Sequence, residues 1–130
     1  MENLMERLEP TGVALPAAGY ALGTLVANPQ TLIHTAGIVG TAPDGTVPED
    51  LAEQARQIWS TIAAILVEGG LGVTDIVSYT AYVVDGQDLS VVMAARDAAL
   101  AGHRSASTLI VVPRLARPEW RMEISAIAAR

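Results

Sequence analysis

The side chain with the clearest chemical potential in this sequence is the carboxylate of Glu123. It stands among apolar residues in the stretch Arg-Met-Glu-Ile-Ser-Ala-Ile-Ala (121–128), which has the alternation of a β-strand. A carboxylate with such neighbours is costly to bury unless it is paired, or it lies in a pocket where it acts as an acid or base. The sequence leaves both alternatives open.

The two histidines have different surroundings. His34 lies in the apolar, β-branched stretch 31–36, and a single histidine in a strand is more often packed and hydrogen-bonded than catalytic. His103 and Arg104 precede an expected strand, in a loop, where functional residues are frequent. The Arg104 guanidinium could bind an anion through two hydrogen bonds, and a solvated loop pair is the equal alternative.

Several kinds of site are excluded because the residues they need are missing. The chain has no Cys and no Lys, so it cannot form a disulfide, a thiolate nucleophile or a Schiff base. The two histidines lie far apart and do not have the spacing of metal ligands, so we expect no metal and no cofactor. The net charge of −6 opposes a nucleic-acid partner, since phosphate backbones require a basic surface.

The composition indicates one small domain with an aliphatic core. The chain has 130 residues, 51% of them hydrophobic and none of them Phe. No apolar run approaches the roughly 18 residues of a membrane span, and Met1–Pro10 lacks the apolar region of a signal peptide. We therefore expect a cytoplasmic protein without a membrane partner, with a single domain over 1–130 and a loose N-terminal arm over 1–15.

The apolar pattern predicts seven elements in the order β-β-α-β-α-β-β. A helix should begin near Pro48 and end at Gly69-Gly70, since its apolar residues recur at helical spacing. A second helix is expected over 89–101, and five of its residues lie roughly on one side: Leu89, Val92, Met93, Arg96 and Leu100. Strands are expected over 20–26, 31–36, 76–84, 108–112 and 120–128, with the first two forming a hairpin.

This order predicts an α+β fold in which both helices cover one face of a mixed sheet. The opposite face would leave aliphatic surface exposed in a single chain this apolar. We therefore expect an oligomer in which the sheets pack against each other.

Several stretches of the sequence resemble the Rid (reactive intermediate deaminase, YjgF-type) family. They are Leu32-Ile-His-Thr-Ala-Gly-Ile38, Gln54-Ala-Arg-Gln57, Gly72-Val-Thr-Asp-Ile-Val77, Tyr82-Val-Val-Asp85, Arg114-Leu115, Pro118-Glu-Trp120 and Met122-Glu-Ile-Ser-Ala-Ile-Ala128. The resemblance runs from about Gly19 to Arg130. It implies a chorismate-mutase-like fold and a homotrimer with small-molecule clefts between neighbouring subunits. Typical members hydrolyse reactive enamines and imines, such as 2-aminoacrylate, to 2-keto acids and ammonia.

The resemblance implies a site that this chain keeps only in part. Tyr20, Gly37 and Glu123 match the family's Tyr, its Gly and the Glu that helps to position the attacking water. Four positions differ, with Ala36 in place of Ser, Met93 in place of Asn, Leu109 in place of Cys, and Ser107 in place of the Arg that binds the substrate carboxylate. We therefore expect a less polar cleft that prefers a neutral or more apolar ligand over 2-aminoacrylate.

The candidate site therefore has two kinds of members. Glu123 and Tyr20 are the candidate catalytic residues, and the candidate substrate-binding residues are Gly37, Ala36, Ser107, Leu109, Met93, Arg104 and His34. Arg104 would restore anion binding if its loop folded over the cleft.

Three functions fit these residues. The first is a Rid-type enzyme that hydrolyses (deaminates) or tautomerises an imine, an enamine or a related carbonyl compound with a shifted substrate. The second is a cyclase or isomerase of specialised metabolism recruited on the same scaffold. The third is a non-catalytic trimer that binds or senses a ligand.

Overall fold

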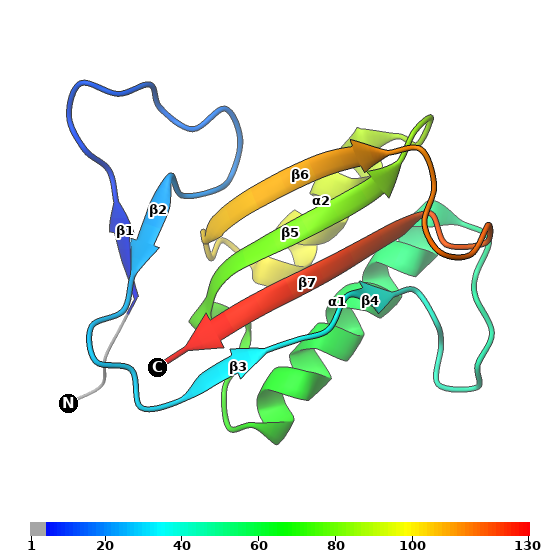
Figure 1. The fold of residues 1–130 in the computed structure, drawn as a ribbon, viewed down its shortest axis with the longest axis horizontal. Coiled ribbons are helices and arrows are strands. Elements are labelled where there is room, and N and C mark those ends of the chain that lie inside the picture. The colour runs from blue at the N-terminus through cyan, green and yellow to red at the C-terminus, as the bar shows by residue number, and fades with distance from the viewer. Residues whose placement is uncertain (1–4) are drawn as a thin grey trace.

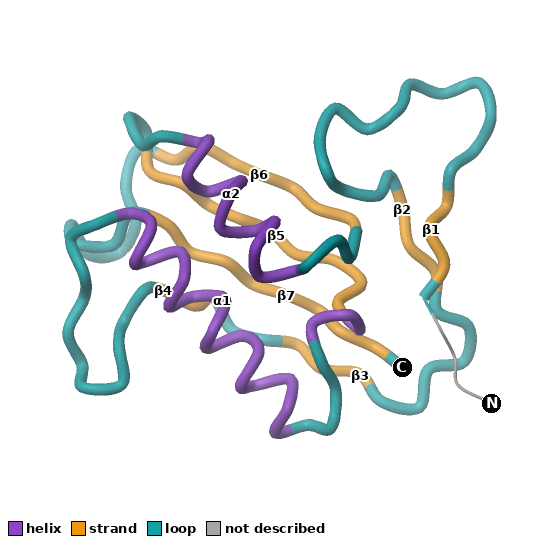
Figure 2. The backbone as a smooth tube through the Cα atoms, turned by 180° about the vertical axis from the view of Figure 1, so that it is seen from behind, coloured by secondary structure: helices purple, strands orange, loops and turns teal. Residues whose placement is uncertain are grey.

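The structure is a computed structural model that describes residues 5–130, and it has the expected α+β architecture. The elements in chain order are β1 (Glu6–Leu8), β2 (Gly23–Leu25), β3 (Leu32–His34), β4 (Ile38–Val39), α1 (Leu51–Glu68), the 3₁₀ helix η1 (Val73–Asp75), β5 (Ile76–Val84), α2 (Leu89–Leu100), β6 (Ala106–Val112) and β7 (Met122–Ala129). Both helices lie behind one sheet, as Figures 1 and 2 show from opposite sides.

The main sheet has the strand order β3-β7-β5-β6, and β4 also pairs with β7. The β5–β6 pair is parallel, and every pair that includes β7 is antiparallel. The last strand of the chain is therefore central, and β5 separates it from β6, which carries Ser107 and Leu109.

The long helix α1 forms where its sequence signals predict. The Asp50 side chain caps its first turn by accepting a hydrogen bond from the Glu53 N–H at 3.2 Å, and Gly69 ends the helix. Its buried stripe packs against the inner face of the sheet in a largely aliphatic core, where Trp59 and Tyr79 meet edge to face at a centroid distance of 5.2 Å.

Strand β7 shows why the sheet has one buried and one uncovered face. Its buried residues alternate with outward ones, and the alternating buried set is Met122, Ile124, Ala126 and Ala128. Glu123, Ser125 and Ile127 point to the other face, which we call the outer face. No helix of the described chain covers that face, where Leu32 of β3 and Ile110 of β6 are 58% and 40% exposed.

The predicted hairpin between 20–26 and 31–36 is wrong. Strand β2 pairs with β1, whereas β3 pairs with β7. The reason is that Gln30 and Thr31 donate backbone hydrogen bonds to the Arg130 carbonyl, so the chain leaves the turn along the end of β7.

Two further strands lie where the sequence suggests no regular structure. Strand β1 lies within the expected loose arm, of which residues 1–4 are outside the described part of the chain. Strand β4 lies in the segment predicted as a loop, and it is only two residues long. Such short strands depend on their pairing partners, which a local sequence pattern does not reveal.

Candidate functional site

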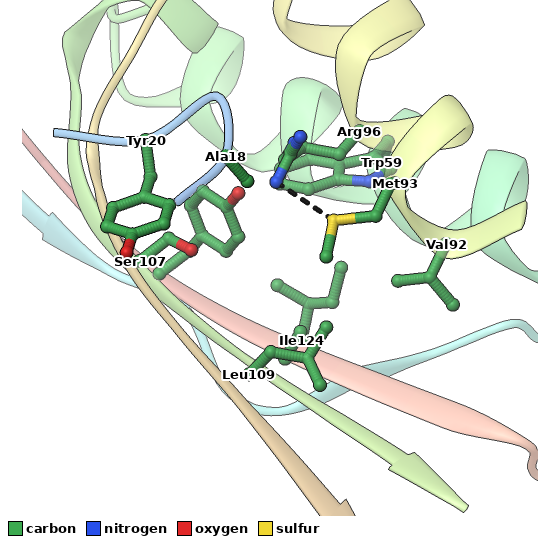
Figure 3. Close-up of a pocket in the computed structure, with 11 residues that line it drawn as sticks. Ala18, Tyr20, Trp59, Val92, Met93, Arg96, Ser107, Leu109 and Ile124 are labelled. Carbon is green, nitrogen blue, oxygen red and sulfur yellow. Dashed lines mark hydrogen bonds between the residues drawn. The ribbon is translucent and has the colours of Figure 1, made fainter. Parts of the chain in front are cut away.

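A cavity of about 180 Å³ opens between α2 and the sheet, and Figure 3 shows the side chains around it. It is lined by Ala18, Tyr20, Trp59, Tyr79, Ala81, Val92, Met93, Arg96, Ser107, Leu109 and Ile124. Four of these residues were candidates from the sequence, namely Tyr20, Met93, Ser107 and Leu109. We call this hollow the α2 cavity.

The pairing of β5 with β6 determines which residues of the sheet line the α2 cavity. In the parallel β5–β6 pair, Ser107 lies opposite Tyr79, and Leu109 lies opposite Ala81. Tyr79 and Ala81 are buried on the helix side, so Ser107 and Leu109 also face the helices.

Tyr20 reaches the same cavity from the N-terminal part of the chain. Ala21 forms an isolated parallel bridge with Ala106, and its N–H donates to the Ser105 carbonyl at 2.9 Å. This bridge places Tyr20 beside the start of β6, and Figure 3 shows Tyr20 and Ser107 together on one side of the cavity.

Helix α2 supplies the opposite wall, where Met93 and Arg96 lie one turn apart. The guanidinium of Arg96 donates from Nε and Nη2 to Oδ1 of Asp97, at 3.0 and 2.9 Å, and from Nη1 to the sulfur of Met93 at 3.2 Å. Burial lowers the pKa of Arg96, but the Asp97 hydrogen bond and the nearby Tyr79 hydroxyl outweigh it, so the pKa lies above its usual value. Arg96 therefore stays cationic although it is only 8% exposed.

Glu123 belongs to a different part of the sheet. It pairs with Val39 of β4 and with Tyr82 of β5, and its side chain is half-buried on the outer face. Its carboxylate lies directly over Gly37, where an added Cβ would collide with Oε2 and come within 2.8 Å of Cδ. Among the described residues the Glu123 carboxylate has no hydrogen-bond or ion-pair partner, so the structural pairing that the sequence left open is not seen there.

The sequence-predicted residues thus form two groups on opposite faces of the sheet. Tyr20, Met93, Ser107 and Leu109 line the α2 cavity, whereas Gly37 and Glu123 meet on the outer face. Ala36 adjoins Gly37 in the chain, and exposed His34 pairs with Ile127 on β7.

The loop pair His103–Arg104 lies outside both groups. Arg104 lines a neighbouring hollow together with Gly19 and Arg96. The ring Nε2 of His103 is 2.8 Å from the Ile76 carbonyl, so this histidine anchors its loop to the start of β5.

Sequence reasoning missed Arg96 as a site residue, although it placed Arg96 on the same side of the second helix as Val92 and Met93. The available signal was a charged residue within an apolar helical stripe, since a buried charge needs a partner or a function. Trp59 and Tyr79 were missed because they belong to the core as well as to the cavity wall.

Two further kinds of site were searched for in the described chain. Residues 5–130 contain no group of three or more His, Asp or Glu side chains placed to hold a metal ion. In the same part of the chain, neither helix has both the length and the apolar character needed to cross a membrane.

Comparison with known proteins gives a consistent result. A family model described as endoribonuclease L-PSP matches residues 11–130. The 2-iminobutanoate/2-iminopropanoate deaminase of Escherichia coli K12 is 36% identical over 124 residues, which cover 91% of this chain and 96% of the relative. Among solved structures, the YjgF gene product of E. coli has a TM-score of 0.72 at 34% identity, covering 88% of this chain and 91% of that one.

Two other solved structures are similar. YyfB of Yersinia pestis, from the Rid family, has a TM-score of 0.84 at 23% identity and covers 99% of this chain and 100% of that one, which shows the shared fold. TdcF of E. coli, solved with bound serine, has a TM-score of 0.72 at 26% identity, with 99% of both chains covered.

Proposed function

Since the chain belongs to the endoribonuclease L-PSP family, also known as the Rid or YjgF-type family, we propose that it hydrolyses a small imine or enamine to a carbonyl compound and ammonia. The observation that carries this proposal is the unpartnered Glu123 carboxylate above Gly37, because a carboxylate held without a partner can accept a proton from water. The curated relatives named as imine deaminases support the same chemistry.

In the proposed reaction, a water molecule that donates a hydrogen bond to Glu123 attacks the imine carbon. A carbon–oxygen bond forms, the carbon–nitrogen double bond becomes single, and Glu123 takes the proton from water. Glu123 returns this proton to nitrogen, which gives a carbinolamine. The carbinolamine then loses its hydroxyl proton to nitrogen, the carbon–nitrogen bond breaks, and ammonia leaves as the carbonyl forms. The Gly37 N–H and the Tyr20 hydroxyl would orient the ligand.

This mechanism requires the two groups of residues to meet, and we propose that a homotrimer brings them together. The outer face of the sheet carries Glu123 and exposed aliphatic residues such as Leu32 and Ile110. A second copy packed against that face would place its α2 cavity beside Glu123, so each cleft would combine two subunits.

The ligand-facing residues support a substrate shifted away from 2-aminoacrylate. Leu109, Met93, Val92 and Ile124 give the α2 cavity apolar walls. Its volume of about 180 Å³ is below the roughly 300–1,000 Å³ of pockets for drug-sized ligands, so it fits a small molecule.

The direct test is Glu123→Gln, which keeps the shape of the side chain and removes its basic carboxylate. We expect the rate of keto-acid release from imines generated in the assay to fall about 10²–10⁴-fold. Glu119→Gln is the matched control, because Glu119 is an exposed glutamate that forms a long ion pair with exposed Arg117, at 3.9 Å. Unchanged turnover of every responsive imine in Glu123→Gln would refute the proposed mechanism.

One observation favours a second candidate, a non-catalytic ligand-binding protein. Three polar family positions in the α2 cavity carry Met93, Ser107 and Leu109 here. A ligand that raises the melting temperature without being consumed would support this function. Nuclease activity, which the family description mentions, is disfavoured by the net charge of −6.

A further inference from the structure

We propose that Arg96 of α2 binds the carboxylate of the substrate. This inference rests on the proposed function, because it takes the α2 cavity as one wall of the substrate cleft. It narrows the substrate to a 2-imino acid whose aliphatic side chain is longer than that of 2-aminoacrylate, and not a neutral compound.

The first argument is that Arg96 is the only charged residue among those that line the α2 cavity. Figure 3 shows its nitrogens above the cavity, across from Ser107 and Tyr20. A carboxylate that enters this space meets one cationic group, and that group comes from the helix.

The second argument concerns the donors that Arg96 still offers. Asp97 occupies the Nε–Nη2 edge of the guanidinium, which leaves the Nη1 end for the cavity. The partner of Nη1 is the thioether sulfur of Met93, a weak acceptor. A carboxylate oxygen that replaced this sulfur would form a stronger, charge-assisted hydrogen bond.

The third argument is burial. The side chain of Arg96 is 9% exposed, whereas that of its partner Asp97 is 66% exposed. Asp97 is therefore largely hydrated and screened, while the cavity side of the guanidinium is shielded from water, where a charged hydrogen bond is stronger.

The fourth argument is the shape of the remaining walls. Leu109 and Ile124 lie below the cavity and Val92 lies beside it, while the hydroxyls of Ser107 and Tyr20 lie on the far side from Arg96. A molecule with its carboxylate at Arg96 would lay a short alkyl chain against Leu109 and Ile124. This arrangement fits an aliphatic 2-imino acid and its 2-oxo acid product.

The test measures binding, so that it does not depend on turnover. The probes are 2-oxobutanoate and its neutral amide, 2-oxobutanamide, titrated into the full-length protein by calorimetry. We expect the wild type to prefer the acid over the amide, and Arg96→Gln to bind the acid roughly 10- to 100-fold more weakly with little change for the amide. Arg56→Gln, which removes an exposed arginine paired with Glu53, should change neither affinity.

A second variant tests the role of Arg96 even if Arg96→Gln misfolds. Asp97→Asn keeps Arg96 and alters an exposed side chain, and it removes the negative charge that partly neutralises the guanidinium. We expect it to bind 2-oxobutanoate several-fold more tightly, with an unchanged circular dichroism spectrum. In kinetics, Arg96→Gln should raise KM for the imino acid more than it lowers kcat.

The outcomes separate the two proposals. A wild type without preference for the acid over the amide, or an Arg96→Gln variant that keeps the preference, overturns the role of Arg96. An Asp97→Asn variant that binds the acid more weakly also overturns it. If the acid binds through Arg96 but no imine is hydrolysed, the proposed function fails and the binding role stands.

Discussion

Gly37 lies so close to Glu123 that a side chain at this position would collide with the Glu123 carboxylate. The Glu123 carboxylate occupies the space that a Cβ at position 37 would take, so the absence of a side chain fixes where the carboxylate can lie. The sequence singled out Glu123, because a strand glutamate among apolar neighbours is unusual, and the family resemblance singled out Gly37. It did not reveal that they touch, since they are separated by most of the chain.

Gly37→Ala should therefore disable the enzyme without unfolding it. The added methyl group displaces the carboxylate, and a displacement of about 1 Å can cost roughly a hundredfold in rate. The measurement is kcat/KM for imine hydrolysis, together with the melting temperature. Gly72→Ala is the control, because no atom lies within 4 Å of a Cβ at that position, and it should keep full activity. An active Gly37→Ala variant would show that the position of Glu123 is not critical.

At the scale of elements, one glutamine fixes α1 to the connection between β6 and β7. The buried Nε2 of Gln54 donates to the carbonyls of Pro48 and Glu119, at 2.7 and 2.9 Å. Its Oε1 accepts the Arg121 N–H at 3.0 Å, just before β7 begins. Gln54 thus positions the strand that carries Glu123.

Gln54→Leu should destabilise the protein by roughly 2–4 kcal/mol, because it leaves two part-buried carbonyls and one part-buried N–H without partners. Urea denaturation gives the free energy of unfolding and so measures this loss of stability. Gln57→Leu lies on the same helix with a single, longer hydrogen bond of 3.3 Å to Thr61, so it should change stability by less than about 1 kcal/mol. Equal effects of the two variants would contradict the role of Gln54.

The long elements were predictable because their signals are local. Helix α1 has its cap at Asp50 and its stop at Gly69, and β5 coincides with the predicted strand 76–84. The hairpin prediction failed because Gln30 and Thr31 bond to the distant Arg130, which no local pattern records. The site could not be predicted fully for the same reason. The role proposed for Arg96 follows from the cavity around it and not from its neighbours in the sequence.

At the scale of the whole molecule, the main feature is that the α2 cavity and Glu123 lie on opposite faces of one sheet. A sheet is too thick for one ligand to touch both faces. The aliphatic surplus seen in the composition lies partly on the outer face, as exposed Leu32 and Ile110 show. Assembly would bury this surface and complete the site together.

Shared clefts predict that two inactive variants restore each other. Tyr20→Phe alters the cavity wall and Glu123→Gln alters the outer face, so a mixed trimer would contain one cleft with both residues intact. Mixed trimers from coexpression, purified through a different tag on each variant, should therefore recover about a third of wild-type activity, because one of their three clefts is intact. As a control, trimers built only from chains that carry both substitutions should show no activity. Absence of recovery in confirmed mixed assemblies would show that each site lies within one chain.

If association through the outer face completes each cleft, the activity of this protein depends on its concentration. If every cleft needs two copies, a chain that has folded but not associated does no chemistry. Dilution would then lower the activity per molecule, and a modest rise in protein concentration near the dissociation constant of the assembly would raise total activity more than proportionally. Synthesis rate alone could set a threshold below which reactive imines persist and above which they are cleared.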